Sequence, residues 1–89
     1  ETINQISSSG QKITDLIASK GSVPGIKVDT GAKVLSNSHD ETITEGLDGL
    51  RDRLKNYYAL GARFTKWRGV YKITEKYPSK LAIHSNAHA

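Results

Sequence analysis

The chain has 89 residues, a net charge of +4 and no cysteine, and 36% of its residues are hydrophobic. This length allows one domain at most, the apolar fraction is low for a chain that buries its own core, and no disulfide can stabilise it. No apolar run approaches the roughly 20 residues that a membrane span needs, and the amino terminus lacks the order of a signal peptide, so we expect a cytoplasmic chain without membrane contact.

The first half of the sequence predicts a helix followed by a strand. Apolar residues recur at helical spacing in residues 11–20, and Gly21 is placed to end that helix. Residues 22–28 are expected to form a short strand. Polar and turn-forming residues dominate the two flanking stretches, so 1–10 is expected to be a connector and 30–40 a loop.

The second half begins with the clearest helix pattern. Thr42 and Glu45 have the S/T-x-x-E order of a capping box, and apolar residues as far as Tyr58 follow on one face. Gly61 is placed to end this helix. Residues 63–73 are rich in aromatic and β-branched residues and predict a second strand.

The predicted order is α/β, with two parallel strands joined by a crossover helix. Ser79 is the expected N-cap of a last helix that continues to Ala89. A parallel sheet is normally covered on both faces and paired at both edges, and this chain supplies too few elements for that. We therefore expect residues 1–89 to be part of a larger domain and not to fold stably alone.

Charged residues alternate with apolar ones in both predicted strands. Because side chains alternate faces along a strand, Lys27 and Asp29 share one face, as do Lys66 and Arg68. If the strands are neighbours, both pairs lie on one side, where they suit an anionic, oxygen-rich substrate. Neighbouring cations also favour the neutral amine that carbonyl chemistry requires. Surface ion pairs at strand ends would explain the same residues, and spacing alone does not decide.

Three segments in matching order carry a resemblance to a known family. They are VPGIKVD at 23–29, TEGLDGL at 44–50 and GARFTKWR at 61–68, and together they closely resemble class I (Schiff-base) fructose-1,6-bisphosphate aldolase of the bacterial type. The resemblance implies an internal fragment of a (β/α)₈ TIM barrel, whose site lies at the carboxyl ends of the strands. It implies reversible cleavage of fructose 1,6-bisphosphate to dihydroxyacetone phosphate and glyceraldehyde 3-phosphate in glycolysis, through a lysine imine without metal or cofactor, in a homo-oligomer.

The resemblance also assigns roles to individual residues. Lys66 matches a catalytic lysine that contacts the substrate beside the imine carbon and stabilises the carbinolamine. Arg68 matches an arginine that orients anionic groups, and Lys27 matches a lysine at the substrate's phosphate end. Asp29 matches an aspartate expected to hold the lysines in place, and Trp67 is expected to pack between barrel and helices.

Parts of the family's site have no counterpart in this sequence. In the family, the imine-forming lysine and the glutamate acid/base pair follow the region that matches this chain, and an aspartate that assists carbon–carbon cleavage precedes it. The 89-residue chain alone is therefore expected to be inactive. Thr65 stands where the family usually has alanine, a small change that should be tolerated.

Two other classes of function are alternatives to the enzyme. A non-enzymatic basic βαβ module binding phosphate or nucleic acid needs stacking surfaces or a basic stripe, which four scattered tyrosines do not supply, so no nucleic-acid partner is expected. An oligomer contact is a third possibility that the sequence does not locate. His84 and His88 are four residues apart, but without a third ligand they do not indicate zinc.

Overall fold

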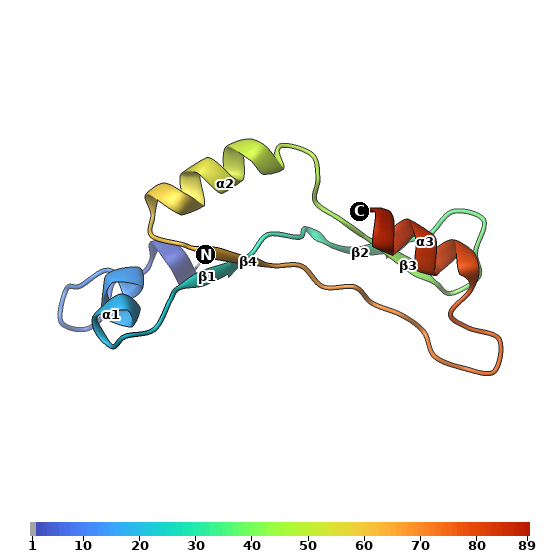
Figure 1. Ribbon diagram of the computed structural model, residues 1–89, viewed down its shortest axis with the longest axis horizontal. Coiled ribbons are helices and arrows are strands. Elements are labelled where there is room, and N and C mark those ends of the chain that lie inside the picture. The colour runs from blue at the N-terminus through green and yellow to red at the C-terminus, as the bar shows by residue number, and fades with distance from the viewer. Residues whose placement is uncertain (1) are drawn as a thin grey trace. The chain divides into compact units, whose positions relative to one another are not determined.

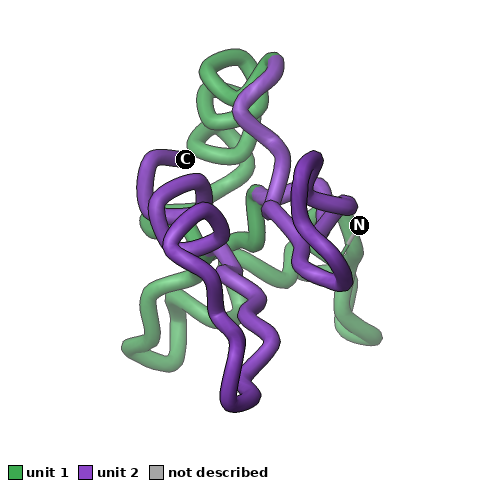
Figure 2. The backbone as a smooth tube through the Cα atoms, turned by 90° about the vertical axis from the view of Figure 1, so that its right-hand side faces the viewer, with its two compact units in different colours: residues 1–28, 49–66 green, residues 29–48, 67–89 purple. Residues whose placement is uncertain are grey.

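The computed structural model describes residues 2–89. Its elements in chain order are the 3₁₀ helix η1 (Thr2–Asn4), α1 (Ile13–Ser19), β1 (Gly25–Lys27), β2 (Gly31–Val34), β3 (Thr42–Glu45), α2 (Leu50–Ala59), β4 (Phe64–Lys66) and α3 (Lys80–His88) (Figure 1). The chain divides into two compact units, coloured green and purple in Figure 2. Unit 1 comprises the chain up to Val28 with residues 49–66, and unit 2 comprises residues 29–48 with 67–89.

Unit 1 is built on the parallel pairing of β1 with β4, as the sequence predicted. The pairing aligns Gly25 with Phe64, Ile26 with Thr65 and Lys27 with Lys66. The Phe64 ring lies directly against Gly25, at a place where a side chain would collide with it. The helix α2 lies between the two strands in sequence, so the βαβ order is confirmed.

The helices of unit 1 are joined by a buried hydroxyl. Thr14 in α1 is buried, and its Oγ1 donates a hydrogen bond to the Leu60 carbonyl at 2.8 Å, just after the last turn of α2. Gly61 follows with φ 109° and ends α2, as predicted. The expected connector at 1–10 instead contains η1, where Ile3 is buried.

Unit 2 contains an antiparallel hairpin that the sequence did not predict. The strands β2 and β3 pair from Gly31 with Glu45 to Val34 with Thr42. The predicted loop at 30–40 is therefore wrong in its first part. The predicted capping box is also wrong, because Thr42–Glu45 is a strand. The β-branched residues of this segment favour the extended pairing, and α2 begins only at Leu50, after Gly49 with φ 66°.

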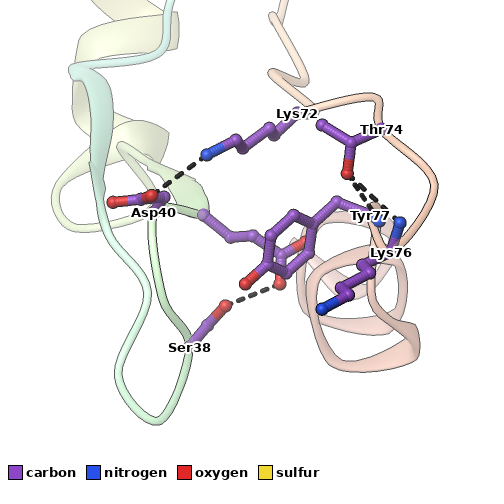
Figure 3. A network of polar contacts seen from close by, with 7 residues as sticks. Ser38, Asp40, Lys72, Thr74, Lys76 and Tyr77 are labelled. Atoms are coloured by element: carbon purple, nitrogen blue, oxygen red, sulfur yellow. Dashed lines mark hydrogen bonds and ion pairs between the residues drawn. The ribbon is translucent and has the colours of Figure 1, made fainter.

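The strand predicted for 63–73 is shorter in the structure. β4 ends at Lys66, and two residues further on the main chain of Arg68 is bound by the side chains of Asp29 and Thr44. The prediction for the last helix is confirmed, since Ser79 Oγ accepts a hydrogen bond from the Ala82 N–H at 3.1 Å and α3 follows. Thr74 Oγ1 accepts the N–H groups of Lys76 and Tyr77 in the turn before it (Figure 3).

A buried carboxylate ties the hairpin to the start of α3. Glu41 accepts hydrogen bonds from Ser38 Oγ at 2.6 Å, from Ser79 Oγ at 2.6 Å and from the Ser79 N–H at 2.9 Å. Burial raises the pKa of Glu41, but the hydrogen bonds from Ser38 and Ser79 outweigh it and hold the pKa below its ordinary value. Beside it, the exposed Asp40 forms an ion pair with Lys72 at 3.0 Å (Figure 3).

Because the pKa of Glu41 is lower in the folded state, its ionisation stabilises the fold above the unfolded pKa, and this contribution is lost as pH falls through the folded pKa. We expect Glu41→Gln in the full-length protein to lower the melting temperature at pH 7, and the difference from the unchanged full-length protein to shrink on acidification below the ordinary carboxyl range. Melting curves recorded across this pH range check it. Asp40→Asn is the control and should have a small effect, since exposed ion pairs contribute little.

The described chain buries few apolar side chains. Among residues 2–89 the buried ones are Ile3, Pro24, Val28, Leu35, Ala62 and Ala82, whereas Val34 and Ile73 are more than 80% exposed. Such exposure leaves little area for hydrophobic stabilisation. Across the described part of the chain, no helix is both long and apolar enough to cross a membrane.

Candidate functional site

Two lysines lie side by side at the end of the sheet in unit 1. Lys27 is the last residue of β1 and Lys66 the last of β4, and the two are register partners. Partners on adjacent parallel strands are separated by about 4.8 Å and project their side chains to the same face. Both residues are exposed. The carboxyl end of this strand pair therefore presents two cations together, an arrangement suited to an anionic group.

The backbone beside Lys27 is held from two directions. The Val28 N–H donates to the Lys66 carbonyl at 3.1 Å, so the pairing of the strands continues one residue past β1. Arg53 of α2 donates from Nη2 to the Val28 carbonyl, also at 3.1 Å. The crossover helix thus fixes the exit of β1. Sequence reasoning missed Arg53, because it placed this stretch only by its apolar face.

In unit 2, Asp29 binds the backbone at Arg68. Asp29 is buried, and its Oδ1 accepts the Gly31 N–H at 3.1 Å while its Oδ2 accepts the Arg68 N–H at 3.2 Å. A buried carboxylate needs such donors, since a charge removed from water is costly unless it is hydrogen-bonded. The structure thus brings Asp29 to the main chain of Arg68. Arg68 itself is exposed.

A second side chain that the sequence did not suggest also binds Arg68. Thr44 of β3 is 2% exposed, and its Oγ1 donates to the Arg68 carbonyl at 2.6 Å. Sequence reasoning missed it because Thr44 was assigned to the first turn of a helix. If this segment is taken as a strand, the alternation of side chains puts Thr42 and Thr44 on the same face. That pattern was the signal in the sequence that could have identified Thr44.

The other residues that the sequence singled out are two histidines and a tryptophan. Within residues 2–89, no group of three or more histidine, cysteine, aspartate or glutamate side chains is placed to hold a metal ion. His84 and His88 lie in α3, where neither is buried. Trp67, expected as a packing residue, is half-buried. The chemistry that the described residues can supply is that of cationic side chains and backbone-bound carboxylates.

Comparisons with known proteins agree on one family. A family model described as class-I fructose-bisphosphate aldolase matches residues 1–89. The chain is 54% identical over 88 residues to the cytosolic fructose-bisphosphate aldolase 6 of Arabidopsis thaliana and 53% identical over 89 residues to a probable class 1 aldolase of Xanthomonas campestris. These matches cover 99% and 100% of this chain but 25% and 27% of the relatives.

A solved structure gives the same result. Fructose-bisphosphate aldolase from Plasmodium falciparum, crystallised with TRAP and a small-molecule inhibitor, superposes with a TM-score of 0.90 at 41% identity, over 96% of this chain and 25% of that one. The chain thus spans about a quarter of the length of the relatives that it matches.

Proposed function

Because this chain belongs to the class-I fructose-bisphosphate aldolase family, we propose that it forms part of the substrate-binding wall of a longer aldolase. Its α/β fold is that of a segment of a (β/α)₈ TIM barrel. The observation that carries the proposal is the alignment of Lys27 with Lys66 at the carboxyl ends of paired parallel strands. Active sites of such barrels lie at this end of the strands.

The proposed reaction is the reversible cleavage of fructose 1,6-bisphosphate to dihydroxyacetone phosphate and glyceraldehyde 3-phosphate, a step of glycolysis. Lys66 is the proposed catalytic residue of this segment. Its ammonium group would stabilise the negative charge that develops on the C2 oxygen as the carbinolamine forms, an electrostatic role that needs a fixed cation. The pairing of Lys66 with Lys27 at the end of β4 fixes its main chain, which supports this assignment.

Lys27 and Arg68 are the proposed substrate-binding cations. Lys27 would contact a phosphate group, and Arg68 would orient anionic groups through its planar guanidinium. Asp29 is proposed to support the site. Its carboxylate fixes the main chain at Arg68, which supports this role, and its predicted effect on the lysines stays a prediction.

The complete enzyme would need groups from other parts of a longer chain. We assign the imine-forming lysine and the glutamate acid/base pair to such parts, so the 89-residue chain alone is expected to be inactive. The exposure of Val34 and Ile73 supports a domain that continues around this segment. The parent enzyme is proposed to be a cytoplasmic homo-oligomer, and two of its relatives carry the word cytosolic in their names.

Borohydride trapping tests this proposal. The full-length protein is incubated with dihydroxyacetone phosphate, reduced with borohydride and digested, and its peptides are weighed by mass spectrometry. We expect one lysine to carry the reduced adduct, on a peptide outside residues 1–89, and we expect cleavage of fructose 1,6-bisphosphate by the untreated protein. An adduct on Lys66 would overturn its assignment as an electrostatic residue. Without any adduct or cleavage, the proposed activity fails.

We do not propose the alternative function, a basic module that binds phosphate or nucleic acid. No feature of the described residues favours it over the aldolase, and each relative named above is an aldolase. The cations at the ends of β1 and β4 suit a small phosphorylated substrate equally well.

A further inference from the structure

The backbone of Arg68 is held on both sides by side chains distant in sequence. Its N–H donates to Asp29 Oδ2 at 3.2 Å, and its carbonyl accepts from Thr44 Oγ1 at 2.6 Å. These are the two peptide groups that flank the Arg68 Cα. Because the two peptide planes on either side of a Cα set the direction of its Cα–Cβ bond, fixing both peptide groups fixes the direction in which the Arg68 side chain leaves the main chain. The guanidinium then has only the side-chain rotamers in which to reach an anionic group.

Thr44 is itself anchored. Its N–H donates to Asn86 Oδ1 at 3.1 Å, and the Asn86 amide group donates to the carbonyls of Thr42, at 3.0 Å, and Ala82, at 2.9 Å. Asn86 lies in α3 and Thr44 in β3, so α3 holds the main chain of the residue whose hydroxyl binds Arg68. Thr44 is 2% exposed, and in a buried setting its hydroxyl must donate to a protein group or leave that donor unsatisfied.

We propose that Thr44, anchored by Asn86, is a positioning residue that sets the placement of Arg68 for an anionic group of the substrate. This inference rests on the proposed aldolase function and on the binding role given there to Arg68. Thr44 does not touch the substrate. It acts by removing the freedom of the segment that follows β4, where no strand pairing restrains the main chain. Asp29 restrains the N–H side of the same residue, and Thr44 restrains the carbonyl side.

Thr44→Val in the full-length protein tests the inference. Valine keeps the shape and the β-branch of threonine but removes the hydroxyl donor. We expect the KM for fructose 1,6-bisphosphate to rise about fivefold, which corresponds to the usual net free energy of one hydrogen bond. The value of kcat should change less. Thr44→Ser keeps the donor and should restore most of the affinity. Thr42→Val is the matched control: it makes the same exchange in the same strand, at a residue whose carbonyl and not its hydroxyl binds Asn86.

A double-mutant cycle with Arg68→Ala separates this inference from the function on which it rests. If Thr44 acts through Arg68, Thr44→Val will raise KM in the unchanged protein and have little further effect once Arg68 is alanine. Additive effects of the two changes would overturn the positioning role. So would a large effect of Arg68→Ala beside a silent Thr44→Val, an outcome that leaves the proposed function standing. If both changes are silent, the binding role of Arg68 fails together with the inference.

Discussion

Replacing Lys66 with alanine in the full-length protein will lower the turnover number for cleavage of fructose 1,6-bisphosphate by about 10²- to 10³-fold, the usual effect of removing one fixed group that stabilises developing charge. Lys66 is the last residue of β4, and parallel pairing with β1 fixes its main chain there. Under the proposed function, its ammonium group would already be in place when charge develops on the substrate oxygen. Steady-state kinetics with the purified full-length variant measures the effect.

Two further variants show whether the lower turnover of Lys66→Ala comes from loss of its charge in the reaction or from a general effect on the protein. Lys55→Ala removes another exposed lysine, on α2, and should leave turnover within about twofold, as expected for a surface change that touches no substrate. Trp67→Phe alters the residue after Lys66, where the side chain is half-buried, and should lower the melting temperature more than it lowers turnover. If Lys66→Ala retained normal turnover, the assignment of Lys66 to the reaction would be wrong.

The parallel strand pair could be predicted because its signals were local and mutually consistent. Short runs of β-branched and apolar residues flank a long helix pattern, and a parallel pair requires such a crossover. The last helix was also predictable, since Ser79 is an N-cap whose hydroxyl accepts the Ala82 N–H three residues along the same segment. Both features depend on the residues that form them and little on distant ones.

The hairpin was missed because its signals were ambiguous. Thr42 and Glu45 fit a capping box, but the same residues are also compatible with a strand, and pairing with residues 31–34 decides between the two. Asn37 and Asp40 adopt positive φ, at 62° and 59°, and close the turn. Both residue types tolerate this conformation without requiring it, so the sequence did not specify the turn.

The charged residues of the candidate site could be predicted from the sequence. The side chains that hold the main chain beside them could not. Alternation along each strand, on the condition that the strands are neighbours, predicted Lys27 and Lys66 on one side of the sheet, and the register of β1 with β4 makes them partners. Arg53 and Thr44 were not predictable, because each binds a main-chain carbonyl, of Val28 and of Arg68, that only the folded chain brings near. Every residue has a main-chain carbonyl, so the sequence does not show which carbonyl a distant side chain will bind.

Replacing Gly46 with alanine will destabilise the full-length protein by about 3 kcal/mol, through backbone strain and overpacking together. Gly46 has φ 139°, a conformation that side chains rarely adopt. An added Cβ would lie 2.9 Å from the Thr30 nitrogen and 3.0 Å from the Asp29 Cα, which are main-chain atoms that cannot swing aside. Denaturant unfolding of the two proteins, compared at equal m-values, measures the difference.

Gly31→Ala separates the two causes. Gly31 also has a positive φ, 110°, but an added Cβ there meets no heavy atom within 4 Å. It should therefore carry only the cost of backbone strain, about 1 kcal/mol at the lower end of its usual range, and the remainder at Gly46 measures the collision with Asp29 and Thr30. Because Asp29 also holds the main chain at Arg68, relief of that collision by movement of Asp29 would raise the KM of Gly46→Ala as well. Equal losses of stability for the two alanines would show that the collision contributes nothing, and that the contact of Gly46 with Asp29 relaxes without cost.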